Sequence, residues 1–353
     1  MEVNIREILR EANEKKASDV FVVAGLPLSM KIKGEIIAVT ESKLMPDDTL
    51  AIIKEIYDIA QNSGFEEFLR VGDSDFSFSV PEIGRFRVNT YRQRSSLAAV
   101  LRIVLFNLPD PAVLGIPPAV IELHTKPKGL ILITGPTGSG KSTTLACLID
   151  AINTHRKGHI ITLEDPIEFI HRHKKSIVSQ REIPMDSLTY LQAVKSALRQ
   201  SPDVILIGEM RDMETISIAL TAAETGHLVL SSLHTMGAAK TIDRILDIFS
   251  NEQQQQIRLQ LAMSLVAVVS QQLVPTVDKG LVAAFEVMMN TTAISTMIRD
   301  GNLHMINTVL HTSANTGMQT MDSSLAALAK KGIITKETAL TYSANPDIMA
   351  RLL

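Results

Sequence analysis

The sequence predicts an α/β protein with a small mixed α/β domain first and a larger domain built on a mostly parallel sheet second, ending in a helical C-terminal region. Residues 1–106 contain short runs in which apolar and polar residues alternate, which is typical of strands with one buried face. From residue 130 onward, continuous apolar runs alternate with helical stretches, which is typical of a parallel sheet covered by helices. A proline-rich segment separates the two patterns.

The first domain begins with a helix that places its apolar residues on one face over residues 4–12. We expect a hairpin that turns at Lys33-Gly34 and a helix over residues 47–69. The predicted strands cover residues 19–24, 75–80, 85–89 and 98–104.

Residues 107–118 form the predicted linker, since they contain four prolines and Gly115. The second domain, residues 119–353, then has four predicted core strands at 130–134, 160–163, 204–207 and 228–231. Each is a continuous apolar run, as expected for strands that are buried on both faces of a sheet.

The last third of the chain is predicted to be helical, with C-terminal helices over about 285–353. Two stripes of apolar residues at helical spacing support this, and helix stripes of this kind more often pack into a core than bind a partner. The stripes are Ile242, Ile245, Leu246 and Phe249, and Ile257, Leu261, Leu265, Val268 and Val269.

Composition excludes several classes of protein. The chain has 353 residues and a formal net charge of -3, without the basic excess that is usual in nucleic-acid binders. Cys147 is the only cysteine, which excludes an intramolecular disulfide and a four-cysteine zinc site. The N-terminus lacks the features of a signal peptide, and no apolar run approaches the roughly 18–20 residues of a membrane span. We therefore expect a cytoplasmic protein.

A complete phosphate-binding loop follows the strand 130–134. Its pattern is Gly135-x4-Gly140-Lys141-Ser142, and a helix-competent run follows it. Lys141 is expected to bind the β- and γ-phosphates of ATP, and Ser142 to ligate Mg²⁺. The predicted nucleotide-binding residues are Gly135, Pro136, Thr137, Gly138, Ser139, Gly140, Lys141, Ser142 and Thr143.

Polar residues follow three of the other core strands. Glu164 and Asp165 come after strand 160–163, Glu209 after strand 204–207, and His234 after the last of these strands, which extends over 228–233. Because ligands of parallel sheets bind at the carboxyl ends of the strands, we expect these side chains near the phosphate loop. Hydrolysis needs such groups to hold the metal and to orient the attacking water.

Two of these positions need comment. The second motif of a nucleotide site usually ends its strand with an aspartate, and Gly208 stands at that position here. The adjacent Glu209 is therefore the candidate that holds Mg²⁺ through water. His227 and His234 lie at opposite ends of one strand, roughly 23 Å apart, so both cannot contact one nucleotide in the same subunit. His234 is predicted to sense the γ-phosphate, whereas His227 is left between a sensing or interface role and a capping or packing role. His171, within a charged run, is predicted to be exposed to solvent.

The order of four motifs resembles that of secretion ATPases: the phosphate loop, then residues 161–169, 208–212 and 226–235. They are similar to the Walker A motif, Asp box, Walker B motif and His box of that superfamily. Nearly the whole chain most resembles the PilT-like branch of the superfamily, the type IV pilus retraction ATPases. The resemblance implies a homohexameric ring whose subunits each have a PAS-like N-terminal domain and a RecA-like C-terminal domain, with ATP between the two.

The resemblance also implies roles for single residues. Glu164 would be the catalytic carboxylate, Glu209 the Walker B glutamate, and Asp165 a further sensor or interface residue. Arg87 and Arg102, from the N-terminal domain, would reach the phosphates. The family further implies a pilus platform protein of the inner membrane as partner, so that the protein would associate with that membrane peripherally.

Two features bear on the branch. Assembly-type relatives have an extra N-terminal domain and a four-cysteine zinc element, which this chain lacks, so a retraction motor is favoured. In the C-terminal signature of retraction ATPases, however, Ser295 and Thr296 replace an arginine and an asparagine. An accessory PilT-like paralogue therefore stays an alternative, and a nucleic-acid translocase is an alternative of another class.

Overall fold

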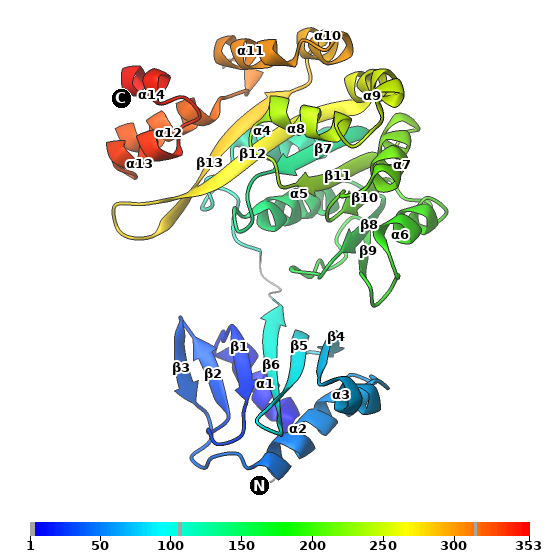
Figure 1. The fold of residues 1–353 in the computed structure, drawn as a ribbon, viewed down its shortest axis with the longest axis vertical. Coiled ribbons are helices and arrows are strands. Elements are labelled where there is room, and N and C mark those ends of the chain that lie inside the picture. The colour runs from blue at the N-terminus through cyan, green and yellow to red at the C-terminus, as the bar shows by residue number, and fades with distance from the viewer. Residues whose placement is uncertain (1–3, 105–107, 314–315) are drawn as a thin grey trace. The chain divides into compact units, whose positions relative to one another are not determined.

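The computed structural model describes residues 4–104, 108–313 and 316–353, and it contains two compact units with one sheet each (Figure 1). One unit comprises residues 1–107 and 168–170, and the other comprises residues 108–167 and 171–353. Residues 106 and 107, at which the sequence predicts the domain to end and the linker to begin, lie outside the described residues.

The N-terminal unit is built on an antiparallel sheet with the strand order β3-β2-β1-β6-β5-β4. Alternating apolar residues of these strands, such as Phe86 and Val88, face a core that they share with the helices. Its elements are α1 (Ile5–Glu14), β1 (Asp19–Val22), β2 (Ser29–Ile32), β3 (Glu35–Ala38), α2 (Pro46–Ile59), α3 (Phe65–Val71), β4 (Asp73–Val80), β5 (Gly84–Gln93) and β6 (Ser96–Val104).

The hairpin predicted at Lys33-Gly34 joins β2 to β3 as expected. The helix predicted over residues 47–69 is instead two helices, because the chain turns between them at Gln61, which has a positive φ of 52°. The Tyr57 ring, near the end of α2, packs against Phe65 and Phe68 of α3 and so fixes the two helices to each other.

The C-terminal unit is built on a seven-stranded sheet with the order β13-β12-β7-β11-β10-β8-β9, in which only β13 is antiparallel to its neighbour. The mostly parallel sheet is thus confirmed. Its elements are α4 (Pro118–Ile121), β7 (Gly129–Thr134), α5 (Lys141–His155), β8 (His159–Glu164), β9 (Ile177–Glu182), α6 (Tyr190–Ala197), β10 (Val204–Ile207), α7 (Met213–Glu224), β11 (Leu228–Leu233), α8 (Ala238–Leu246), α9 (Asn251–Ser264), β12 (Leu265–Pro275), β13 (Leu281–Met289), α10 (Thr292–Asp300), α11 (Ile306–Thr312), α12 (Met321–Lys330), α13 (Lys336–Tyr342) and α14 (Pro346–Leu352).

Both faces of this sheet are covered, which explains its continuous apolar strands. On β7, Leu130 and Leu132 pack into a core with α7 and α9, whereas Ile131 and Ile133 pack on the other face with α5. Every residue of β7 is buried, since its side chains alternate between these two cores.

Two predictions for the last third are wrong. The apolar stripe from Ile257 to Val269 is not one helix, because α9 ends at Ser264 and the chain enters β12, which pairs with β7 and β13. The C-terminal helices therefore begin at Thr292 and not near residue 285. Strand β9 was not predicted either.

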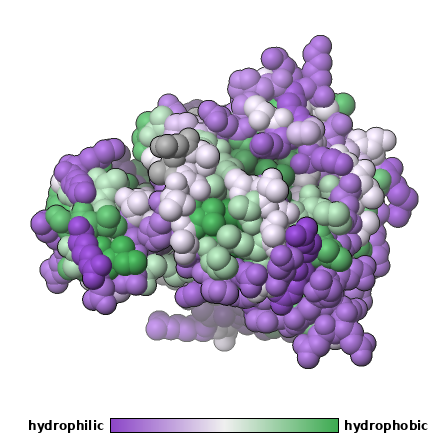
Figure 2. Space-filling model, turned by 90° about the horizontal axis from the view of Figure 1, so that it is seen from above, coloured by the Kyte–Doolittle hydropathy of each residue, from purple (hydrophilic) through white to green (hydrophobic). Residues whose placement is uncertain are grey.

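In the view of Figure 2, hydrophilic side chains surround smaller hydrophobic areas. Within the described ranges, no helix has both the length and the apolar character that crossing a bilayer requires.

Candidate active site

The phosphate loop connects β7 to α5, as the sequence predicts. Gly135, Gly138 and Gly140 have φ values of 144°, 77° and 88°, a region that favours glycine, and these turns direct the loop onto the N-terminus of α5. A loop of this kind presents backbone N–H groups, together with the positive end of the helix dipole, to an anion. The arrangement therefore fits a phosphate-binding site.

Lys141 is held against the loop. Its Nζ donates hydrogen bonds to the carbonyl oxygens of Gly135, at 3.0 Å, and Pro136, at 2.9 Å, and the residue is buried. Ser142 and Thr143 follow in the first turn of α5, half-buried. The ammonium group and the Ser142 hydroxyl thus lie at the start of the same helix.

Strand β12 contacts the loop from beside β7, through a residue that the sequence analysis missed. Gln271 is buried, and its Nε2 donates a hydrogen bond of 2.5 Å to the carbonyl of Ser139. Its own backbone oxygen approaches Gly135 so closely that a Cβ there would lie 2.1 Å away. The position of the phosphate loop therefore depends on β12.

The carboxyl ends of β8, β10 and β11 are neighbours in the sheet, and they carry the predicted polar residues. Glu209 lies beside His234, with 3.6 Å between its Oε2 and the His234 Nε2, and it forms an ion pair of 2.7 Å with Arg211. The Glu164 carboxylate accepts hydrogen bonds from Thr162, at 2.7 Å, and Gln180, at 3.2 Å. The structure thus brings Glu209 and His234 together, at the same edge as Glu164.

A second missed residue lies among these strand ends. Tyr190 is the first residue of α6, and an ideal Cβ built on Gly208 would lie 2.8 Å from its hydroxyl oxygen. Burial raises the pKa of the phenol, and the charges of Glu209, Asp165 and Glu164 raise it further. Tyr190 is therefore a neutral donor beside three carboxylates.

The donor set fits Mg²⁺. The ion prefers oxygen ligands and commonly combines one or two protein groups with substrate phosphates and waters. The Ser142 hydroxyl could ligate it directly and the half-buried Glu209 carboxylate through water, with ATP supplying phosphate oxygens. Among the described residues there is no group of three or more His, Cys, Asp or Glu that could hold a metal ion alone.

His227 does not join this site. It precedes β11, at the opposite end of the strand from His234, and its Nδ1 lies 3.0 Å from the carbonyl oxygen of Ala222 in α7. The same carbonyl also accepts the backbone N–H of His227, at 3.1 Å, so both contacts lie in the last turn of α7, where the capping alternative would place this residue. Asp165, in contrast, is exposed directly after β8.

Arg87 and Arg102 lie directly opposite each other on β5 and β6 of the N-terminal unit. Arg102 also forms an ion pair of 3.0 Å with Asp19, whereas its own side chain stays 69% exposed. Neighbouring positions on one face of a sheet allow the two guanidinium groups to act on the same anion.

A pocket of about 210 Å³ adjoins the phosphate loop. Gly140, Thr143 and Gln271 line one side, and most of the remaining lining is apolar, including Leu114 and Phe285. A mostly apolar pocket with a few polar groups is typical of small-molecule sites, and this one continues from the loop that would bind the phosphates.

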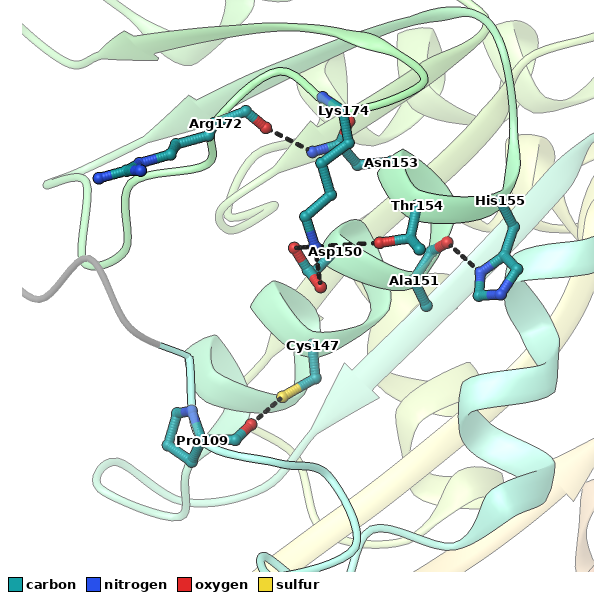
Figure 3. A network of polar contacts seen from close by, with 9 residues as sticks. All are labelled: Pro109, Cys147, Asp150, Ala151, Asn153, Thr154, His155, Arg172 and Lys174. Carbon is teal, nitrogen blue, oxygen red and sulfur yellow. Dashed lines mark hydrogen bonds and ion pairs between the residues drawn. The ribbon is translucent and has the colours of Figure 1, made fainter.

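Helix α5 also contacts two other segments of the chain, one at Pro109 and one at Arg172 and Lys174 (Figure 3). Lys174 forms an ion pair of 2.7 Å with Asp150, and the Asn153 side chain donates to the Arg172 carbonyl at 2.7 Å. Cys147 lies 3.8 Å from the carbonyl of Pro109, in the predicted linker, and burial raises the pKa of its thiol to about 11. The helix that begins at the phosphate loop thus contacts both the chain entering the unit and the segment after β8.

His171, at the start of this segment, is buried and not exposed as predicted. Burial lowers the pKa of its imidazole to about 4.

Comparisons with known proteins agree with this geometry. Residues 1–334 match the family described as Type II/IV secretion system protein. The chain is 43% identical to the type IV pilus retraction ATPase PilT of Pseudomonas aeruginosa, over 98% of this chain and 99% of that protein. It is 40% identical to a twitching motility protein of Neisseria gonorrhoeae, over 98% of this chain and 92% of the other.

Solved structures give the same result. A crystal structure of the pilus retraction motor PilT with bound ADP matches with a TM-score of 0.89 and 44% identity, covering 99% of this chain and all of that one. The Legionella pneumophila ATPase DotB matches with a TM-score of 0.74 and 29% identity, covering 95% and 94%. The two units therefore correspond to an N-terminal domain and a RecA-like domain, and the chain belongs to the Type II/IV secretion system family as an ATPase of its PilT-like branch.

Proposed function

We propose that the protein is a hexameric motor that couples hydrolysis of Mg·ATP to the retraction of a type IV pilus. The observation that carries the proposal is the phosphate loop with Glu164, Glu209 and His234 at neighbouring strand ends, in a chain that is similar over nearly its full length to a pilus retraction ATPase. A phosphate loop alone explains nucleotide binding, whereas hydrolysis also needs groups that orient water and metal.

Each residue then has a role in the reaction. Lys141 binds the β- and γ-phosphates, and Ser142 holds Mg²⁺, which neutralises developing charge on the phosphates when it is bound. Glu164 accepts the proton of the attacking water, and Glu209 holds the hydration shell of the metal. His234 senses the γ-phosphate through its contact with Glu209.

The pocket of about 210 Å³ would receive the adenine base, because it begins at Gly140 and Thr143 and is mainly apolar beyond them. Apolar walls favour a flat aromatic base through burial of its faces. Asp165 and His227 are assigned no chemical step; they stay candidates for a sensing or interface role, with capping of α7 as the alternative for His227.

Motion would come from the two domains. We propose a PAS-like domain of residues 1–106, a linker of residues 107–118 and a RecA-like domain of residues 119–353, with ATP bound between the domains. Arg87 and Arg102 would then reach the phosphates, where arginines stabilise the charge of the transition state. Their register on β5 and β6 supports a joint action on one anion.

The motor would act in the cytoplasm at a platform protein of the inner membrane, as the pilus systems of its relatives imply. A second candidate, an accessory PilT-like subunit, is favoured by one observation. Ser295 does not project freely from α10, because its hydroxyl donates a hydrogen bond of 2.8 Å to the carbonyl of Ala262 in α9. It replaces the arginine of the retraction signature and cannot supply that charge.

A biochemical and a cellular experiment together test the proposal. Lys141→Ala should abolish ATP hydrolysis. Lys128 is an exposed lysine just before β7, at the end of the strand that lies away from the phosphate loop, and Lys128→Ala should leave hydrolysis unchanged. A Lys141→Ala protein with full ATPase activity would refute the mechanism.

The cellular experiment is deletion of the gene, scored for pilus number and twitching motility. Excess pili with lost motility support a retraction motor, unchanged motility supports the accessory subunit, and lost pili would point to assembly. Salt-sensitive DNA binding by the purified protein would instead support a translocase.

A further inference from the structure

We propose that Tyr190 is a positioning residue for ATP hydrolysis: its hydroxyl occupies the space of the missing side chain at position 208 and orients the attacking water beside Glu164. The inference rests on the proposed function, because it assumes that Glu164 and Glu209 act on one nucleotide.

The first argument is the location of the phenol. Helix α6 begins at Tyr190, its N-terminus is capped by the Thr189 side chain, which accepts a hydrogen bond from the Gln192 backbone N–H, and it packs against β8 and β10. The ring packs on the core of the C-terminal unit, so that the hydroxyl is presented at the carboxyl ends of the strands. Few rotamers are open to a ring held in this way, and its oxygen is therefore well placed in advance of the reaction.

The second argument is Gly208. A Cβ at this position would lie 2.8 Å from the Tyr190 hydroxyl and 3.2 Å from the carbonyl oxygen of Leu163. Many P-loop enzymes have an aspartate near this strand end, and it holds Mg²⁺ or its waters. Here a side chain at position 208 would collide with the phenol, so the hydroxyl takes the place of that side chain.

The third argument is hydrogen bonding. Glu164 and Glu209 in their ionised form only accept hydrogen bonds, whereas a protonated phenol donates one. Burial and the neighbouring carboxylates keep the Tyr190 hydroxyl protonated. Within the part of the chain that the structure describes, this hydroxyl makes no hydrogen bond, so its proton is available to a water between the two carboxylates.

The consequence for the reaction is a fixed orientation of that water. It donates one hydrogen to Glu164 and accepts one from Tyr190, which leaves its other lone pair to attack the γ-phosphorus. The bond between the γ-phosphorus and the bridging oxygen breaks, the water proton passes to Glu164, and ADP and phosphate leave. Tyr190 keeps its own proton throughout.

Tyr190→Phe is the test, because it removes the hydroxyl and keeps the ring in place. We expect kcat to fall about tenfold, which corresponds to about 1.4 kcal/mol, with the KM for ATP changed less than about twofold, since the phosphate loop is untouched. The melting temperature should stay within about 2 °C, since the ring keeps its packing and the lost hydroxyl makes no hydrogen bond among the described residues. Tyr342→Phe, at the exposed end of α13, is the matched control and should change none of these values.

Two double variants distinguish positioning from a structural role. In a Glu164→Gln background, Tyr190→Phe should cause less than about a twofold further loss, because groups that act on one water are not additive. In a Gly208→Ala background, it should raise the melting temperature, because removing the oxygen relieves the contact at 2.8 Å.

The proposal is overturned if Tyr190→Phe has the kcat of the unmodified protein, if its effect multiplies fully with that of Glu164→Gln, or if it fails to stabilise Gly208→Ala. Such a result is distinguishable from failure of the proposed function, which would appear as ATP hydrolysis that survives Lys141→Ala.

Discussion

Substituting Gly135 with alanine should disrupt the phosphate loop through strand β12. The added Cβ would lie 2.1 Å from the backbone oxygen of Gln271 and 2.8 Å from the Ser139 hydroxyl, at a φ of 144°. Because a Cβ is essentially never closer than 3.0 Å to a non-bonded heavy atom beyond its own chain neighbours, β7 and β12 would have to separate by about 0.9 Å at this point. Both strands are buried in the centre of the sheet, where such a shift cannot be absorbed by a flexible side chain.

The expected magnitude has two parts. The unfavourable backbone conformation costs about 1–3 kcal/mol, and forced separation of packed groups costs about another 1–3 kcal/mol. We therefore expect a loss of about 4 kcal/mol in the free energy of unfolding. For a domain of this size, that loss lowers the melting temperature by roughly 8–16 °C.

Gly138→Ala is the control within the same loop. Its φ of 77° is also positive, but an added Cβ would meet no heavy atom within 4 Å. Only the backbone term applies, about 1–2 kcal/mol or roughly 2–8 °C. Thermal unfolding followed by circular dichroism without nucleotide measures both variants. Equal destabilisation by the two substitutions, or a Gly135→Ala protein as stable as the unmodified one, would refute the role assigned to β12.

Three further predictions concern the site and its surroundings. Glu164→Gln should lower kcat at least about 100-fold through loss of the general base, with the Kd for ATP within about threefold, as measured by steady-state kinetics and calorimetry. Gln271→Leu should weaken ATP binding about tenfold, because the Ser139 carbonyl loses its hydrogen-bond donor. The melting temperature should change little, because the substitution also removes the buried Gln271 Oε1, which has no hydrogen-bond partner. Calorimetry that shows an unchanged affinity for ATP would contradict this prediction. The third prediction is a pH dependence of stability. The pKa of the buried His171 is about 4 in the folded protein and 6.5 in the free residue. As the pH falls from 6.5 towards 4, the unfolded state therefore binds a proton that the folded state does not, and the free energy of unfolding decreases. The free energy of unfolding, measured with urea, should therefore decrease by about 2 kcal/mol between roughly pH 7 and pH 5, and His171→Gln should reduce that decrease. The same dependence on pH in the variant would show that other groups cause it.

The parallel sheet could be predicted because its strands carry a local signal. Four continuous apolar runs, each followed by a polar residue or a glycine-rich turn, identify the strands and the edge at which ligands bind. This edge predicts that Glu209 and His234 lie near the phosphate loop, whereas their contact with each other also depends on β10 and β11 being neighbours in the sheet.

Strand β12 could not be predicted from the same kind of signal. Residues 257–269 keep an apolar spacing that fits a helix, and a continuous apolar run is compatible with a buried helix or a buried strand. The choice is made by pairing with β7, which lies more than 130 positions earlier in the chain. Gln271 was missed for this reason, since its contact with the phosphate loop exists only when residues 265–275 form a strand.

Tyr190 was missed for a different reason. The tyrosine belongs to no nucleotide-binding motif, and its position at the start of α6 gives no local indication of function. Only the packing of α6 against β8 and β10 brings its hydroxyl to Gly208. Residues that act through such distant packing leave no pattern in a single sequence.

Cys147 gives the protein a practical property for labelling experiments. Thiol reagents attack the thiolate, and this buried thiol, with its pKa raised to about 11, forms almost none at neutral pH. The folded chain should therefore react slowly with maleimide dyes even though it contains a cysteine. One new surface cysteine in each unit would give a site-specific dye pair on the natural background, and energy transfer between the dyes would report the distance between the units during each catalytic cycle.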